Sequence, residues 1–195
     1  MDQSRAQEAA PVLIGHFSTW WRGDPLPALP AVPDLAVAPC ADDRLVASLM
    51  GIDVGAVRER IQRGHRPWLA RIGEVPVGWG WVAASEAEIP ELGITFALQP
   101  GDRYLWDFTT LPPWRGHDVY PALLQAILVE EGATRFWIGH DRDNAASARG
   151  MAKAGFREVG TAHRRPDGQL MFVPSASAER AAAAVVYLSL PMTDL

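Results

Sequence analysis

The order of strand, turn and helix after residue 103 places the strongest constraint on the fold of this chain. Residues 104–110 (YLWDFTT) combine aromatic and β-branched side chains, which is typical of a strand. The Pro-Pro-Trp-Arg-Gly sequence at 112–116 predicts a tight turn, and residues 119–131 have the apolar periodicity of an amphipathic helix. A strand that enters a helix through so short a turn predicts helices layered on a sheet.

The same alternation continues to residue 163. Residues 135–139 predict a strand, residues 144–154 predict a helix that Gly155 ends, and residues 156–163 predict another strand. Strands and helices that alternate after an antiparallel meander favour a mixed sheet. We therefore expect one α/β (α+β) domain in which helices flank a mixed central sheet.

The preceding part of the chain supplies two short helices and the meander. Asp42 or Asp43 is placed to cap a helix that runs to about Met50, and Asp53 is placed to cap a second helix that Gly64 ends. Two antiparallel strand pairs follow in the sequence. We predict them at 68–72 with 75–84, joined at residues 73–74, and at 92–98 with 103–110, joined by the turn at 99–102.

The ends of the chain are less regular. Apolar side chains predict a short helix that ends at about Trp21, and the five prolines between residues 24 and 39 then exclude a helix, although a short strand fits at 35–38. We assign residues 1–41 to an N-terminal helix and Pro-rich segment packed on a domain of residues 42–195. Residues 175–184 fit a surface loop or a short helix, and residues 185–190 predict a final strand.

Composition excludes several classes of protein. The chain of 195 residues is 48% hydrophobic, which suits one globular domain with a sizeable core. Its net charge of -5 argues against general binding to nucleic acid or to an anionic membrane surface. The single cysteine, Cys40, belongs to no grouping with metal-ligand spacing, so we expect no metal. Without a predicted membrane span or leader, a cytoplasmic location follows as the expectation.

The turn at 112–116 also indicates chemistry. The first N–H groups of a helix have no partner within the helix, and together with the helix dipole they favour a phosphate group. Gly116 lets such a group approach the backbone closely. The sequence therefore predicts a phosphate-bearing ligand at this junction of strand and helix.

The residues 115–120 (RGHDVY), together with Asn144 and the Gly155-Phe156 pair, resemble the GCN5-related N-acetyltransferase (GNAT) family. Its acetyl-CoA loop follows the pattern Arg/Gln-x-x-Gly-x-Gly/Ala, and its order of elements matches residues 45–190. The resemblance implies an enzyme that transfers an acetyl or other acyl group from acetyl-CoA to a primary amine of a small molecule or a peptide. The residues that it implies for binding acetyl-CoA are Phe108, Thr109, Thr110, Leu111, Arg115, Gly116, His117, Asp118, Val119, Tyr120, Asn144 and Ser147.

Three positions depart from the family pattern. Asp118 stands where the family has its middle glycine, Tyr120 where it has glycine or alanine, and Met151 where many members have a tyrosine that protonates the leaving thiolate. We expect the Asp118 carboxylate to repel a pyrophosphate and to cap the following helix with its own side chain. Asn144 also suits a plain helix cap, which by itself explains its residue type.

Direct acyl transfer needs a group that takes a proton from the amine. Asp107 interrupts an apolar strand, and a half-buried carboxylate there would have a raised pKa, although pairing with an arginine or a backbone amide across the sheet explains the residue better. Glu91 and His140, the latter at the end of the strand before Asn144, are the weaker candidates. Trp79, Trp81, Trp106 and Trp114 suit either the core or the wall of a pocket.

Two alternatives remain open at this point. The same fold can serve as a non-catalytic domain that binds a metabolite or a partner, and Asp118 and Met151 favour that interpretation. In either case a homodimer is open. Residues 45–66 also resemble a helix-turn-helix that binds DNA. In that alternative Arg58, Arg60, Arg63, His65 and Arg66 would contact phosphates.

Overall fold

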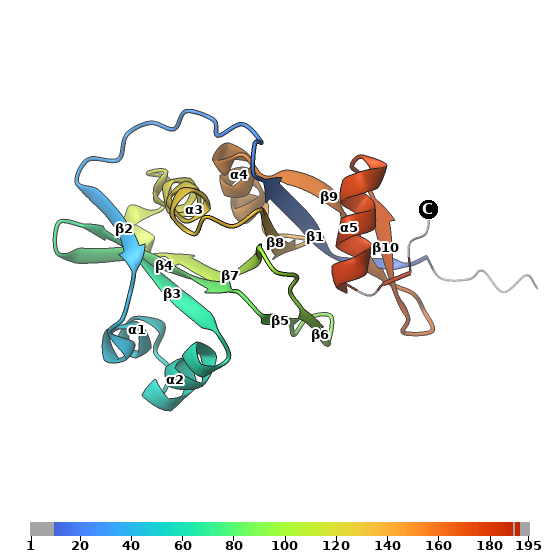
Figure 1. The fold of residues 1–195 in the computed structure, drawn as a ribbon, viewed down its shortest axis with the longest axis horizontal. Coiled ribbons are helices and arrows are strands. Elements are labelled where there is room, and N and C mark those ends of the chain that lie inside the picture. The colour runs from blue at the N-terminus through green and yellow to red at the C-terminus, as the bar shows by residue number, and fades with distance from the viewer. Residues whose placement is uncertain (1–9, 189, 192–195) are drawn as a thin grey trace, which may run out of the picture.

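An eight-stranded mixed sheet forms the centre of the structure (Figure 1). The computed structural model describes residues 10–188, 190 and 191. The order of strands across this sheet is β10-β9-β1-β8-β7-β4-β3-β2. In chain order these strands are β1 (Val12–Trp21), β2 (Leu35–Pro39), β3 (His65–Ile72), β4 (Val75–Ala83), β7 (Asp102–Thr110), β8 (Arg135–Asp141), β9 (Arg157–Arg164) and β10 (Leu170–Pro174). A separate hairpin pairs β5 (Glu86–Ile89) with β6 (Ile94–Ala97).

Helices cover both faces of the sheet. They are α1 (Asp43–Met50), α2 (Val54–Gln62), η1 (a 3-10 helix, Pro112–Trp114), α3 (Val119–Glu130), α4 (Ala145–Ala154) and α5 (Ala178–Leu188). Along β8, Phe136 and Ile138 pack in the cluster that contains α3 and α4, whereas Trp137 between them packs in the cluster that contains α5 and the β5–β6 hairpin. Because side chains alternate along a strand, α3 and α4 lie on one face, and α5 and the hairpin lie on the other.

Helices α1 and α2 lie on the same face as α5. Trp81 of β4 packs between these two helices, while its neighbour Val82 points to the α3 face. Asp42 caps α1 by accepting hydrogen bonds from the N–H groups of Arg44 and Leu45, and Asp53 caps α2 by accepting one from Gly55. Both caps and both helices are confirmed as the sequence predicted.

The expected N-terminal helix is wrong over the described residues, because β1 is a strand near the middle of the sheet. It pairs antiparallel with β8 on one side and with β9 on the other. A strand that is covered on both faces has a nearly continuous apolar sequence, which periodicity alone does not separate from a helix. Residues 1–9 of the expected helix lie outside the described residues.

The second predicted strand pair is also wrong. Residues 94–97 form β6 and pair with β5, while β7 pairs with β4 on one edge and with β8 on the other. The turn at 99–102 therefore leads from the hairpin into the main sheet instead of joining two partners. A turn signature shows that the chain changes direction, and the neighbouring strands determine which edges then meet.

Near the end of the chain the structure differs from the sequence prediction in two ways. Residues 178–188 form one helix, so the strand expected at 185–190 is wrong over residues 185–188, and residue 189 lies outside the described residues. Consecutive alanines favour a helix, and the buried Ala181, Ala184, Tyr187 and Leu188 repeat at helical spacing. The strand β10, which pairs with β9, was absent from the sequence prediction.

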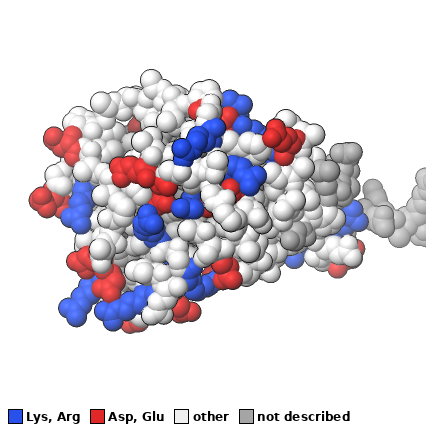
Figure 2. Space-filling model, viewed as in Figure 1, with Lys and Arg blue, Asp and Glu red and all other residues white. Residues whose placement is uncertain are grey.

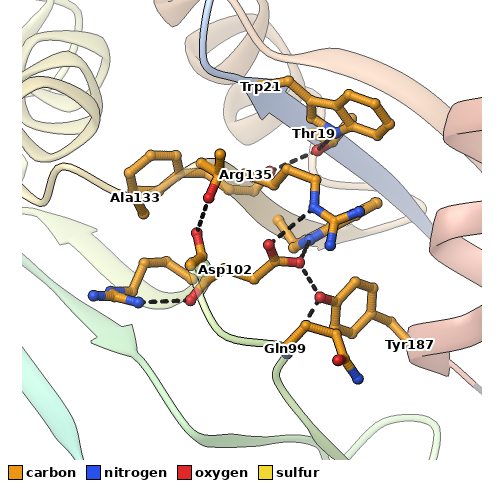
Figure 3. A network of polar contacts seen from close by, with 12 residues as sticks. Thr19, Trp21, Gln99, Asp102, Ala133, Arg135 and Tyr187 are labelled. Atoms are coloured by element: carbon orange, nitrogen blue, oxygen red, sulfur yellow. Dashed lines mark hydrogen bonds and ion pairs between the residues drawn. The ribbon is translucent and has the colours of Figure 1, made fainter.

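A buried carboxylate joins the starts of β7 and β8 to α5. Asp102 is 1% exposed and accepts hydrogen bonds from Arg135 Nε at 2.9 Å, from Trp137 Nε1 at 3.1 Å and from the Tyr187 hydroxyl (Figure 3). The Arg135 guanidinium lies over the ring of Trp21, 5.7 Å from its centroid. These contacts hold together three elements that are far apart in the sequence.

We predict that Asp102→Ala lowers the free energy of unfolding by about 3 kcal/mol, because it leaves Arg135, Trp137 and Tyr187 without their shared acceptor. The matched control is Asp107→Ala, which removes a more exposed ion pair with Arg60 and is expected to cost less than about 1 kcal/mol. Denaturant unfolding followed by tryptophan fluorescence measures both. Equal losses in the two variants would contradict the central role of Asp102.

Candidate functional site

The site begins where β7 and β8 separate. Their parallel pairing runs from Asp102 with Arg135 to Leu105 with Ile138 and then stops. Beyond that point β7 continues to Thr110, and this edge of it has no strand partner among the described residues. The opening holds a cavity of about 930 Å³, which is within the range of sites for small molecules and cofactors.

A bulge in β7 shapes the wall of this cavity. Gly80 of β4 stands opposite two residues, Asp107 and Phe108, between the pairs formed by Trp81 with Trp106 and by Trp79 with Thr109. Asp107 takes a left-handed conformation with φ 53°, which is uncommon for a residue other than glycine. A Cβ atom at Gly80 would lie only 2.1 Å from the Phe108 ring, so the glycine is what lets that ring lie against β4.

The loop between β7 and α3 presents free backbone donors. Five consecutive N–H groups, those of residues 116–120, make no hydrogen bond to any described residue. Gly116 has φ 79° and Asp118 has φ 56°, so the loop turns through left-handed conformations at both positions. Successive free amides at the start of a helix are suited to an anion, and the phosphate ligand expected here from the sequence stays a prediction.

Asp118 does not cap α3, and the expectation that its side chain occupies these donors is wrong. Its carboxylate forms an ion pair with Lys153 Nζ on α4 instead. The left-handed backbone at Asp118 turns the residue away from the geometry that a side-chain cap needs, and it also explains why glycine suits this position. The carboxylate of Asp118 therefore meets a compensating charge beside the anion site.

Helix α4 forms the opposite wall of the cavity. Asn144 caps it by accepting a hydrogen bond from the Ser147 N–H at 3.0 Å, as its residue type suggested. The Ser147 hydroxyl lies 3.2 Å from the Tyr120 hydroxyl, and the Tyr120 ring lies so close to Gly150 that any side chain there would collide with it. Burial raises the pKa of Tyr120 to about 12, and the hydrogen bond with Ser147 opposes that rise.

Most of the residues predicted to bind a cofactor line this one cavity. The lining residues among them are Phe108, Thr109, Thr110, Arg115, Gly116, Asp118, Val119, Tyr120, Asn144 and Ser147. The exceptions are Leu111 and His117, and His117 lines a smaller neighbouring pocket next to the Pro-rich segment. Met151, at the position where the family has a tyrosine, is 2% exposed and lies in the core outside the cavity lining.

The acid-base candidates Asp107 and His140 line the cavity, but each has a partner. Asp107 is exposed and forms an ion pair with Arg60 of α2 at 2.7 Å, which agrees with the arginine partner given as the other interpretation of this residue and not with a half-buried, unpaired carboxylate. The Nδ1 atom of His140 lies 2.8 Å from the backbone oxygen of Asp141, to which it donates. The His140 ring stacks on that of His16, with 4.8 Å between centroids.

His16 was not predicted as a site residue, because it lies in the segment that was expected to be a helix. It lines the cavity, and its Nδ1 lies 2.8 Å from a carboxylate oxygen of Glu158 on β9. Trp106 and Trp114 also line the cavity, whereas Trp79 and Trp81 are core residues. Strand pairing between β1 and β8, which places His16 beside His140, was the missing information.

The helix-turn-helix alternative is disfavoured by the contacts of its basic residues. Arg58 pairs with Asp43, Arg60 with Asp107, Arg63 with Glu86, and Arg66 with Glu131, while His65 is buried. Figure 2 shows positive and negative side chains mixed over the region of α1 and α2. Arginines that are already paired with carboxylates have little to offer the phosphates of DNA.

Within residues 10–188, 190 and 191, no group of three or more His, Cys, Asp and Glu side chains has a metal-binding arrangement. Over the same residues, no helix is long and apolar enough to cross a membrane.

Comparisons with known proteins place the fold. No protein-family model matches the chain, and no curated protein matches its sequence. A GCN5-related N-acetyltransferase from Kribbella flavida matches with 18% identity and a TM-score of 0.52, over 79% of this chain and 58% of that one. A GCN5-related N-acetyltransferase from Sphaerobacter thermophilus matches with 15% identity and a TM-score of 0.54, over 79% of this chain and 50% of that one.

A third match is to the aminoglycoside acetyltransferase AAC(6')-Ib in complex with coenzyme A. It is 17% identical, with a TM-score of 0.51, over 71% of this chain and 92% of that one. This chain therefore spans only 58% and 50% of the first two proteins and nearly the whole of the third. At these identities the likeness establishes the fold, which is that of the GNAT family.

We predict that Gly80→Ala lowers the free energy of unfolding by about 1–3 kcal/mol, because the added methyl group forces the Phe108 ring out of its place. Denaturant unfolding of the single variants and of Gly80→Ala with Phe108→Ala forms a double-mutant cycle. If the collision causes the loss, Gly80→Ala costs much less once the ring is gone. The same cost in both backgrounds would contradict this account of the bulge.

Proposed function

We propose that this chain, whose fold is that of the GNAT family, is an N-acetyltransferase that moves an acetyl or other acyl group from acetyl-CoA to a primary amine. The observation that carries the proposal is the row of five free amides at residues 116–120, which borders a cavity in the opening between β7 and β8. These donors suit the pyrophosphate of CoA. We place the reaction in the cytoplasm, which suits the single Cys40.

The remainder of the cofactor fits the same cavity. The pantetheine arm would lie along the free edge of β7 at residues 108–111 and pair with its backbone as an added strand does. Asn144 and Ser147 would flank the arm on the α4 side, and Arg115 would add positive charge at the phosphates. The structure of AAC(6')-Ib with coenzyme A supports a CoA ligand for this fold.

The reaction in this proposal is a direct transfer. The neutral amine attacks the thioester carbon, the carbon–sulfur bond breaks, and CoA leaves as its thiolate while the nitrogen loses a proton. His140 is the better acid-base candidate, because Nδ1 donates to Asp141 and leaves Nε2 of the neutral ring with a free lone pair. Asp107, which Arg60 holds, is better suited to positioning. Solvent would protonate the thiolate, since Met151 has no proton to give.

The second candidate function is a non-catalytic domain that keeps the GNAT fold and uses the cavity to bind a metabolite or a partner. Tyr120 favours it, because its ring bridges from Phe108 on β7, at 5.7 Å between centroids, to Gly150 on α4. The Tyr120 ring therefore narrows the cavity between its β7 wall and its α4 wall. The burial of Met151, which removes a proton donor from the cavity, favours it as well.

We expect acetyl-CoA and CoA to bind in calorimetry with a stoichiometry of one, and acetyl-CoA to release free thiol when primary amines are added. Both follow from the free amides and the open edge of β7. The assay runs over a panel of alkyl, aryl and peptide amines. Binding without release on any amine would favour the non-catalytic domain, and no binding of either compound would refute the enzyme.

We expect Asp118→Gly to tighten CoA binding several-fold. The change removes a negative charge beside the anion site, frees Lys153 to meet the phosphates, and lets glycine adopt φ 56° without strain. Asp118→Asn is the matched control, since it removes the charge but keeps the size of the side chain. Calorimetry measures both, and an unchanged dissociation constant in both variants would refute the influence of this carboxylate.

A further inference from the structure

Tyr104 is a largely buried side chain that lines the cavity. The residue is 6% exposed, and its hydroxyl forms no side-chain hydrogen bond within the described part of the protein. The Tyr104 hydroxyl has room because the neighbouring strand β8 has a glycine, Gly139, beside it. A Cβ atom at Gly139 would lie 3.4 Å from the hydroxyl oxygen and 3.2 Å from the Phe17 ring. A hydroxyl at a cavity that forms no hydrogen bond to the protein keeps both its donor and its acceptor capacity for a ligand.

Glu91 is a second group without a partner, and it lies at the same cavity. Two other carboxylates of the lining are compensated, since Glu88 pairs with Arg63 at 3.5 Å and Asp107 pairs with Arg60 at 2.7 Å. Glu91 is exposed, and its carboxylate forms no ion pair among the described residues, although Arg164 donates a hydrogen bond to its backbone oxygen at 3.3 Å. Burial raises the pKa of Tyr104 well above its usual range, and the nearby Glu91 carboxylate raises it further, so the phenol stays neutral beside this charge.

Both groups lie on the face of the sheet opposite to the anion site. Tyr104 packs with Trp137, Phe96 and the hairpin β5–β6 in the cluster that contains α5, whereas Phe108 packs with α3. Tyr104 also lies near the point where β7 and β8 separate, because its pair with Trp137 is followed by only one further pair, Leu105 with Ile138. A molecule seated at Tyr104 would therefore reach the opening in the sheet from the side away from α3 and α4.

We propose that Tyr104 and Glu91 bind the amino group of the acceptor, and that the acceptor is a primary alkyl amine that arrives as a cation. This inference rests on the proposed function and names its substrate class. The Glu91 carboxylate compensates the ammonium charge, and the Tyr104 hydroxyl accepts one of its hydrogen bonds. Phe17, Ile89 and Leu92, which are buried and line the cavity, contact the carbon chain of the amine.

The charge requirement has a direct test that does not need turnover. Calorimetric titration compares n-butylamine with butan-1-ol, which has the same length and no charge. We expect the unaltered protein to bind the amine at least tenfold more tightly than the alcohol, and Glu91→Gln to remove most of that difference. Equal affinity for the two compounds in the unaltered protein would overturn the proposal, whatever the result with acetyl-CoA.

The role of the hydroxyl is tested by Tyr104→Phe. We expect it to raise the dissociation constant of n-butylamine about tenfold, and the KM for the amine likewise, while the dissociation constant of acetyl-CoA stays within twofold. The melting temperature should not fall, because the hydroxyl has no protein partner to lose. Tyr187→Phe is the matched control: its hydroxyl donates to Asp102, so this variant should melt lower without a change in amine affinity.

The outcomes separate the two proposals. A lower melting temperature for Tyr104→Phe with unchanged amine affinity would show a structural role and overturn this inference. Loss of acetyl-CoA binding in the unaltered protein, with n-butylamine still bound through Glu91 and Tyr104, would refute the transferase and leave the amine site standing.

Discussion

The buried Asp102 is the interaction on which the geometry of the cleft depends. It accepts hydrogen bonds from Arg135 and Trp137 on the neighbouring strand and from Tyr187 on the last helix, so it fixes where β7 and β8 start side by side. Two parallel strands that are held together only at their first four residues are free to diverge afterwards. The width of the cavity is therefore set at its closed end, by residues that lie outside the cavity lining.

The sequence predicted the part of the fold whose signals are local. Helix caps such as Asp42 and Asp53, the turn at 112–116 and the helix that starts near Val119 depend on neighbours in the chain, and all of them are confirmed. Strand pairing is not local. The apolar sequence of β1 suits a helix as well as a strand between two partners, and residues 94–97 gave no sign that they pair with β5 rather than β7.

The residues of the site divide in the same way, into those with a local sequence signal and those that only distant contacts bring together. The loop at residues 115–120 was predictable because it is one continuous segment with a glycine and a helix start, and all of its residues except His117 line one cavity. His16, Tyr104 and Glu91 come from three separate strands and loops, and only the sheet brings them to the same opening. The roles of Asp118 and Tyr120 required side-chain contacts, with Lys153 and with Ser147, that no pattern in the sequence indicates.

The position of β1 has a consequence for how the chain acquires its structure during synthesis. Among the strands of the described sheet it comes earliest in the sequence, yet both of its partners, β8 and β9, come more than a hundred residues later, as the hydrogen bond between Thr19 and Phe136 shows. A ribosome-bound chain must keep this apolar segment unpaired until the strand β8 has emerged. Completion of the sheet is thus a late, long-range step in the folding of this chain.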